Sequence, residues 1–482
     1  MKSRASLWFG GIVALYAALF VLYAETAAFT PDEGYHLLAA QLIAAGRTPY
    51  LDFCFPQTPL NAYWNALWLR LLAHSWRVPH LLAALSTVAA VWLTGDYVLR
   101  HFPIVTWRLP AALATALLTG LNGVVFPYGP LQAYGICLLG LVAAFRFTLR
   151  AVEHGRAIHF AAAGFFAGIA AASSLLTAAA VPVFAIWNAY HQPAGARWRT
   201  LCAFTAGFAA PFLPVFYLVA RAPRQTWFNL VRYHAFYRKL YWPETTQHDF
   251  EVLSAWLLDS QALILGVLAL AGLLYVFRRT NWPASVKAQH ALCAWLAAAL
   301  SLEVGRAHPT FPRYFLLTVP FLAILAAAGL YALVSALRLE RSLWPVTLLS
   351  LLMLAGLART LYDRSQTIDT WSSLEAVAAK VDQVTRPGAP VLTVEPIYFL
   401  TRRTPPPGYE LSYSHLVTLP PAEATLLHLL NAAQVKRQVQ SGAFATVSST
   451  DSDEVDDWDL RTLYRQSAEV GDYYLFWDWK GR

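Results

Sequence analysis

Residues 30–36 read Thr-Pro-Asp-Glu-Gly-Tyr-His, and they directly follow the first long apolar segment of the chain, near residues 7–28. A segment of that length spans a membrane as a helix, which needs roughly 20 residues. The T-x-x-E spacing of Thr30 and Glu33, with a proline at the first helical position, is typical of a helix N-terminus with a capping box. A capping box would use the carboxylate of Glu33. The neighbouring Asp32 side chain would then remain available to face a cleft.

The composition places the chain among integral membrane proteins. Of its 482 residues 57% are hydrophobic and only 13% are charged, and the mean hydropathy is +0.43. Apolar stretches of spanning length recur, so we expect a mainly α, polytopic membrane protein with about eleven transmembrane helices. The stretches lie near residues 7–28, 80–99, 109–127, 131–149, 158–174, 175–190, 200–220, 254–277, 288–304, 312–336 and 343–361.

The loops between these stretches are alternately rich in arginine and lysine. By the positive-inside rule, this alternation predicts a cytoplasmic N-terminus and places the residues after about 362 on the outer side of the membrane. The net charge of +8 is then mostly an orientation signal, and nothing in it indicates binding to nucleic acid. We expect a membrane domain at residues 1–363 and an extracytoplasmic domain at residues 364–482.

Two long segments between spans are expected on the outer side. The first loop (residues 29–79) should contain a helix from Asp32 to Gly46 lying along the membrane surface, because its apolar residues follow helical spacing. A second helix should begin at Thr58-Pro59, where a cap-then-proline start precedes an aromatic, apolar face suited to the bilayer interface.

The second loop (residues 221–253) is basic and aromatic, against the trend expected for an outer segment. Two explanations remain open: an interfacial helix whose cations meet lipid headgroups, or a specific anion site. A further outer turn is also cationic, at the ends of two helices. The candidate cations are Arg232, His234, Arg238 and Lys239 in the second loop and Arg306, His308 and Arg313 in the turn.

The extracytoplasmic domain reads as a small α/β fold. Helical patterns near residues 370–385 and 422–439 alternate with strand-like runs at 391–394, 444–447 and 473–476. No glycine-rich nucleotide loop, zinc motif or hydrolase motif occurs in the sequence. An acidic stretch at residues 451–459 is better explained as a solvated turn than as a divalent-ion site.

Three segments of the first loop together resemble the first outer loop of GT-C glycosyltransferases, in the protein mannosyltransferase-like branch (glycosyltransferase family 39, aminoarabinose transferase-like). The segments are a D-E pair after the first span, a G-x-x-P-Y-x-D-F turn and a P-x-x-P-L entry to the next helix. They lie at Thr30 to His36, Ala45 to Phe53 and Phe55 to Leu60.

The resemblance implies a bacterial inner-membrane enzyme that transfers a sugar, with inversion, from a polyprenyl-phosphate carrier to an acceptor on the outer face. It implies Asp32 as the general base, because an attacking hydroxyl needs a proton acceptor within hydrogen-bond reach. Glu33 would orient the acceptor or complete the cap. The same motifs place Tyr35, His36, Asp52 and Gln57 near the substrates.

The sequence differs from the motif of its relatives at one position. Many relatives have a lysine just before the final proline-leucine of the P-x-x-P-L segment, and this chain has Thr58 there. The phosphate of the leaving group must then be held by other cations, and the seven candidate cations above are offered for this role. The resemblance also allows a divalent metal ion, since some relatives use one, but no ligand spacing here requires it.

Two other functions are compatible with the sequence. A transporter or flippase for a lipid-linked saccharide would hold the same phosphate, but such proteins place ionisable groups near the bilayer midplane. The expected spans carry few charges apart from Asp96 and Arg146 near helix ends, which favours the transferase. A catalytically silent membrane scaffold is the third hypothesis. Sugar, acceptor and oligomeric state are not indicated by the sequence.

Overall fold

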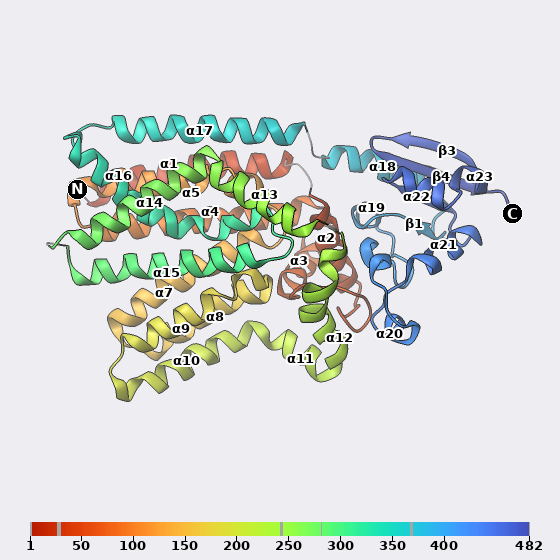
Figure 1. The fold of residues 1–482 in the computed structure, drawn as a ribbon, viewed down its shortest axis with the longest axis horizontal. Coiled ribbons are helices and arrows are strands. Elements are labelled where there is room, and N and C mark those ends of the chain that lie inside the picture. Colours follow the sequence, from red (N-terminus) through yellow and green to blue (C-terminus); the bar gives the residue numbers. More distant parts are fainter. Residues whose placement is uncertain (1, 27–29, 242–243, 281, 367–369, 482) are drawn as a thin grey trace. The chain divides into compact units, whose positions relative to one another are not determined.

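The computed structural model describes residues 2–26, 30–241, 244–280, 282–366 and 370–481. The chain forms two compact units, each assembled from three separate stretches (Figure 1). We call the first the helical unit; it comprises Met1–Glu25, His80–Leu213 and Glu244–Gln366. We call the second the mixed unit; it comprises Thr26–Pro79, Pro214–Pro243 and Thr367–Arg482.

The helical unit consists mainly of long helices that run side by side, with the four-residue α6 among them (Figure 1). They are α1 (Lys2–Thr26), α4 (Arg77–His101), α5 (Arg108–Gly120), α6 (Val125–Tyr128), α7 (Tyr134–His154), α8 (Ala157–Ser173), α9 (Ala180–Tyr190), α10 (Arg197–Ala209), α13 (Thr245–Leu258), α14 (Ser260–Arg278), α15 (Ala284–Arg306), α16 (Val319–Ala336) and α17 (Trp344–Ser365).

Seven helices of the described residues are long and apolar enough to cross a membrane: α1, α4, α7, the run Ala194–Arg221, α14, α16 and α17. Two shorter apolar helices, Ala157–Ser173 and Leu175–Tyr190, lie at the expected spans near residues 158–174 and 175–190. The remaining expected spans are also helical, at α5 and α15. The mainly α, polytopic fold is confirmed, while the total of about eleven spans stays a prediction.

Small residues allow two helices of this unit to touch through their backbones. A Cβ atom on Gly272 of α14 would lie 1.9 Å from the carbonyl oxygen of Leu325 in α16. A Cβ atom on Gly329 of α16 would lie 1.9 Å from the carbonyl oxygen of Leu268 in α14. Close backbone contact of this kind stabilises helix pairs in lipid, where apolar burial gives little driving force.

The two charges noted near the helix ends bind each other. Arg146 of α7 donates to Asp96 of α4 at 3.0 Å and to the carbonyl of Leu93 at 2.8 Å. Arg100 completes the arrangement with a bond to Asp96 at 2.7 Å. Because the guanidinium and the carboxylate neutralise each other, this buried pair has an evident structural role.

The mixed unit begins with α2 (Pro31–Ala44) and α3 (Leu60–Leu71) of the first loop. From the second loop it takes α11 (Leu213–Arg221), α12 (Pro223–Trp227), the π-helical segment Phe228–Tyr237 and a 3-10 turn at Arg238–Tyr241. Its C-terminal part has helices α18 (Trp371–Val384), α19 (Glu395–Leu400), α20 (Pro421–Leu426), α21 (Ala432–Gln440), α22 (Ser452–Asp457) and α23 (Leu460–Leu463).

The C-terminal part also carries a four-stranded sheet. Its strands are β1 (Val391–Leu392), β2 (Thr446–Ser449), β3 (Tyr464–Val470) and β4 (Tyr473–Trp479), in the order β1-β2-β4-β3. Strands β1 and β2 are parallel, with Val391 opposite Thr446, whereas β2–β4 and β3–β4 are antiparallel. The small α/β fold expected here is confirmed. Strand β3 was not predicted, and the single helix expected near residues 422–439 is divided into α20 and α21.

One apolar core joins the first loop to the C-terminal part. Leu37 and Ala40 of α2 pack with residues of α18, β1 and α19, including Leu374 and Val391. The rings of Trp76 and Trp371 stack with centroids 4.9 Å apart and planes 5° apart. The first loop therefore folds as part of the same unit as the C-terminal residues. The expected boundary between residues 363 and 364 stays a prediction.

Candidate functional site

The start of α2 positions the acidic pair. Thr30 has an extended backbone and Asp32 and Glu33 occupy the first helical turn, where the positive end of the helix dipole favours carboxylates. Thr30 makes no side-chain capping bond, and Glu33 N–H bonds instead to the Thr30 carbonyl at 2.9 Å. The expected capping box does not form, because a backbone bond takes the place of the side-chain cap. Asp32 is half-buried, while Glu33 is buried.

The start of α3 also differs from the expectation. Pro59 is the N-cap and Leu60 is the first helical residue, so the proline does not follow a threonine cap. Thr58 precedes this N-cap, two residues before the first helical residue, and is 1% exposed. The aromatic face of α3 is present, with Trp64 and Leu67 exposed.

Helix α19 packs directly against α2 at Gly34. A Cβ atom at this position would lie 2.5 Å from Cδ of Pro396, closer than two carbon atoms approach, so only glycine fits there without a shift. This contact brings the neighbouring Glu395, a residue that the sequence analysis did not consider, to the side of the acidic turn. Glu395 is buried and accepts hydrogen bonds from the backbone and hydroxyl of Ser412 at 2.7 and 2.9 Å.

Asp32 acts electrostatically on two neighbours. Burial raises the pKa of Glu395, the bonds from Ser412 oppose this rise, and the charge of Asp32 adds to it. Burial lowers the pKa of His36 to about 4, against a smaller opposing effect of Asp32. Asp32 thus lies beside a neutral imidazole and a second carboxyl group that resists ionisation.

The surroundings of this acidic turn are aromatic. The rings of Tyr35, His36 and Phe55 lie near one another, with centroids 4.9 Å apart for Tyr35–Phe55 and 5.8 Å apart for His36–Phe55. Within the described part of the chain, the Tyr35 hydroxyl and His36 Nδ1 are buried without a hydrogen-bond partner. The same holds for polar atoms of Thr58 and Asn61 in the first loop. Buried polar atoms normally have partners, so this region is suited to a hydroxyl-rich ligand.

The second loop lies against the first through residues of the π-helical segment. Asn229 accepts a hydrogen bond from the backbone of Phe55 at 2.8 Å and one from Cys54 Sγ at 3.4 Å. Low solvent access lowers the pKa of His234 to about 4, the charge of Arg238 adds to this, and a hydrogen bond to the backbone of Pro56 opposes it. His234 is therefore a neutral contact between the loops, and Arg238 is the cation beside it.

Two motif residues have local partners. Asp52 is exposed and accepts a hydrogen bond from the backbone of Thr48 at 2.6 Å, which closes the turn between α2 and α3. The backbone carbonyl of Gln57 accepts a bond from the hydroxyl of Tyr50 at 2.5 Å. Both residues shape the turn, and their expected contacts with substrate stay predictions.

Other candidate cations have carboxylate or aromatic partners. Arg232 pairs with Glu423 of α20. In the helical unit, His308 Nδ1 lies 2.5 Å from Asp249, and the guanidinium of Arg313 lies 4.2 Å from the ring centroid of Phe311. Arg306 and Lys239 are exposed. The seven candidates thus fall into two sets, the second-loop cations of the mixed unit and the turn cations of the helical unit.

Several charged residues of interest lie outside the sequence motifs. Glu410 is buried and binds Arg47 at 3.1 Å, and burial raises the pKa of its carboxyl group. Arg364 of the helical unit is 7% exposed, lies 4.3 Å from the ring centroid of Tyr128, and has no hydrogen-bond partner among the described residues. Tertiary folding buries these groups, and no local pattern in the sequence marks them.

The described residues contain no group of three or more histidine, cysteine, aspartate or glutamate side chains arranged to hold a metal ion. The acidic stretch near residue 451 is used locally, because Asp451 caps α22 by accepting from the backbone of Asp453 at 2.8 Å. Lys436 pairs with Asp457 at 2.8 Å.

Comparison with known proteins gives a result at the level of structure. No protein-family model matches the chain, and no curated protein matches it either. Among solved structures, the chain is similar to ArnT from Cupriavidus metallidurans in the apo state, with a TM-score of 0.70 and 15% identity over 98% of each chain. The same protein bound to undecaprenyl phosphate gives a TM-score of 0.69 and 15% identity, covering 98% of this chain and 97% of that one.

A second neighbour is more distant. The oligosaccharyltransferase of Archaeoglobus fulgidus, tethered to an acceptor peptide, has a TM-score of 0.52 and 11% identity, covering 92% of this chain and 69% of that one. ArnT is an aminoarabinose transferase, and both neighbours belong to the same superfamily. The chain therefore shares its fold with ArnT over nearly its whole length.

Proposed function

We propose that this protein is an integral-membrane glycosyltransferase that moves a sugar from a polyprenyl-phosphate carrier to an acceptor hydroxyl, with inversion at the anomeric carbon. The observation that carries the proposal is the surroundings of Asp32, which lies at a helix start beside neutral His36 and buried Glu395. The fold supports it, because a neighbour with this fold binds undecaprenyl phosphate. Fold alone does not define activity, so the residues around Asp32 are the basis of the assignment.

In the proposed reaction, the acceptor hydroxyl oxygen attacks the anomeric carbon of the donor sugar. The bond from that carbon to the phosphate oxygen breaks, and its electron pair leaves with the polyprenyl phosphate. The proton of the hydroxyl passes to the carboxylate of Asp32, which acts as general base. The buried polar atoms of Tyr35 and His36 are suited to hydrogen bonds with sugar hydroxyls.

The test of the base is replacement of Asp32 by asparagine in the purified full chain, supplied with a lipid-linked sugar. We expect kcat to fall by at least about 100-fold, the size of a general-base contribution, because the amide cannot accept the proton. The matched control is Asp472→Asn, which removes an exposed carboxylate from a turn of the same unit. Turnover by Asp32→Asn equal to that of the control refutes the assignment.

The leaving phosphate needs a cation, and we assign Arg238 to it. This residue lies beside His234, which contacts the first loop through Pro56, and its planar guanidinium suits phosphate oxygens. We expect Arg238→Gln to raise KM for the lipid-linked donor by about tenfold, the effect of about 1.4 kcal/mol. Arg221→Gln is the control, since Arg221 is an exposed arginine at the end of α11. An unchanged KM in Arg238→Gln excludes this role.

A further inference from the structure

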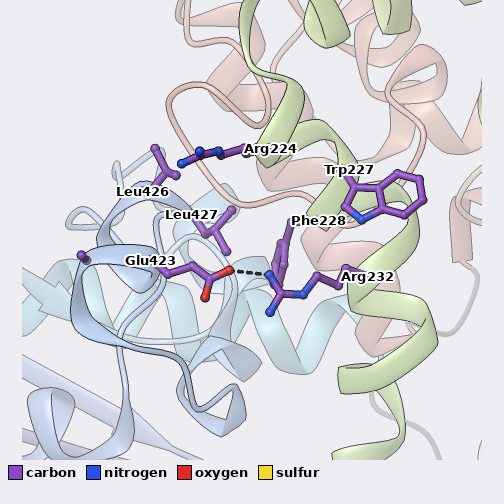
Figure 2. Close-up of a pocket in the computed structure, with 8 residues that line it drawn as sticks. Arg224, Trp227, Phe228, Arg232, Glu423, Leu426 and Leu427 are labelled. Atoms are coloured by element: carbon purple, nitrogen blue, oxygen red, sulfur yellow. Dashed lines mark hydrogen bonds and ion pairs between the residues drawn. The ribbon is translucent and has the colours of Figure 1, made fainter.

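The mixed unit has a cavity whose lining includes none of the residues of the acidic turn. It has a volume of about 490 Å³, and one wall comes from α12 and the π-helical segment, the other from α20 and the residues around it (Figure 2). The lining residues are Arg224, Trp227, Phe228, Arg232, Ala422, Glu423, Leu426 and Leu427. Two guanidinium groups and one carboxylate thus share a cavity whose other walls are aromatic and aliphatic.

The two arginines of this cavity differ in their partners. Arg232 binds Glu423 across the cavity (Figure 2), and both side chains are about one-third exposed, at 35% and 32%. Partly exposed pairs of this kind typically contribute only about 0–1 kcal/mol to stability. Arg224 is exposed, and the described residues offer it no carboxylate partner. The cavity therefore has one exposed guanidinium group, that of Arg224, and a second that binds Glu423 and donates to the hydroxyl of Tyr237 at 3.3 Å.

Two residues that line the cavity, Arg224 and Trp227, follow a possible membrane span closely in the sequence. The apolar helical run Ala194–Arg221 is long enough to span a bilayer, and Arg224 follows its end by three residues. The polar layer of a bilayer is about 5–8 Å thick on each side, so lipid headgroups lie within reach of residues this close to a span. Trp227 is 60% exposed, and tryptophan beside arginine is typical of the membrane interface.

We propose that this cavity binds the phosphate headgroup of an anionic membrane phospholipid, with Arg224 and Arg232 as phosphate ligands and Glu423 as the group that the lipid displaces. Arginine donates two parallel hydrogen bonds to phosphate oxygens, which is a stronger arrangement than an exposed pair with a carboxylate. Leu426, Leu427 and Trp227 supply apolar surface for the upper part of the acyl chains. This site is distinct in its residues from the site proposed for transfer.

The displacement of Glu423 gives the proposal a direction that can be tested. Loss of either arginine should weaken lipid binding, whereas loss of the Glu423 charge should strengthen it, because Arg232 is then available without competition. A variant that merely unfolds cannot produce tighter binding. The pair of opposite effects separates a specific headgroup site from general attraction of anionic lipid to a chain of net charge +8.

The experiment is native mass spectrometry of the full-length protein in detergent, titrated with phosphatidylglycerol or with phosphatidylcholine. We expect the double variant Arg224→Gln/Arg232→Gln to weaken retention of phosphatidylglycerol about tenfold, and Glu423→Gln to strengthen it about threefold. The control variant Arg221→Gln/Arg437→Gln removes the same charge from exposed arginines outside the cavity and should bind like the unmodified protein.

Three results overturn the proposal: equal retention of phosphatidylcholine, an equal loss in the control variant, or weaker binding by Glu423→Gln. A further arm adds glycerol 3-phosphate as a soluble competitor. If it displaces phosphatidylglycerol at an equal concentration, the cavity binds a soluble anion and the assignment to a membrane lipid is wrong. All of these measurements report lipid binding and none depends on glycosyl transfer. Their outcome is therefore independent of the test of Asp32.

Discussion

At the scale of single residues, Glu395 is the group whose burial most directly concerns the proposed reaction. Burial raises the pKa of Glu395 and the charge of Asp32 adds to this rise, so by reciprocity a negative charge on Glu395 opposes ionisation of Asp32. We therefore expect Glu395 to act as a positioning residue that sets the pH range in which Asp32, the proposed base, is ionised. Its helix, α19, is anchored on α2 by the contact of Pro396 with Gly34.

Replacement of Glu395 by glutamine should change the pH dependence of transfer and leave the activity in place. We expect the acid limb of the profile of kcat/KM against pH to move to lower pH, with kcat within about tenfold of the unmodified enzyme. The measurement is the full pH profile of the Glu395→Gln variant, with Asp472→Asn as control. A lowered rate with an unmoved acid limb would indicate a purely structural role.

The same substitution should alter stability in a pH-dependent way. The folded chain raises the pKa of Glu395 above 4.5, so above that pH the folded state holds a proton that the unfolded chain releases. The contribution of this group to stability therefore falls as pH rises through the raised pKa. Glutamine does not titrate, and its carbonyl can still accept from Ser412. The thermal midpoint should therefore fall less between about pH 5 and about pH 8 in the variant than in the unmodified protein.

Some residues of the site can be predicted from the sequence and others cannot. Asp32, Tyr35 and His36 lie within two turns of one helix, so a short motif marks them together. Glu395 and Arg364 are buried by contacts that tertiary folding makes, and a buried charge has no sequence pattern of its own. The capping prediction for Thr30 was wrong because the backbone of Glu33 supplied the bond that the side chains were expected to make.

At the scale of elements, the sequence predicts helices better than it predicts the sheet. Helix α2 ends at Ala44, close to the expected end at Gly46, which has a φ of +91°. Strand β3 has four exposed positions among its seven residues, because it is the edge strand of the sheet and has little apolar alternation to detect. Its position is set by pairing with β4.

The junction of α2 and α19 is the contact between elements on which the site depends, and Gly34 tests it. In Gly34→Ala the new Cβ would meet Pro396 at 2.5 Å, so α19 must move away from α2. Overpacking of this kind costs about 1–3 kcal/mol. We expect a lower thermal midpoint and a pH profile changed in the same direction as that of Glu395→Gln.

The control for this variant is Gly11→Ala, since no heavy atom lies within 4 Å of a Cβ atom at Gly11 in α1. It adds the same methyl group to a helix without crowding. If both variants behave alike, or if Gly34→Ala lowers stability and leaves the pH profile unmoved, the contact does not position Glu395.

At the scale of the whole molecule, the composition predicts the membrane class and the motifs of the first loop predict the fold, because both depend on local sequence. What the sequence does not reveal is that three distant stretches form one unit. That grouping follows from shared apolar burial, such as the packing of Ala66 and Leu69 of α3 with Phe399 of α19. Such contacts arise only when the chain is folded.

This grouping predicts that the first loop cannot keep its structure without the C-terminal residues. In a chain that ends at Gln366, α2 and α3 lose the partners of Leu37, Ala40 and Trp76, and each fully exposed leucine costs about 1.5–3 kcal/mol. We expect hydrogen exchange in residues 31–76, followed by mass spectrometry, to rise strongly while α14 and α16 stay protected. Supplying residues 370–482 as a separate fragment should restore protection. If residues 31–76 are equally protected in the truncated chain, the first loop folds on its own and the acidic turn does not require the C-terminal part.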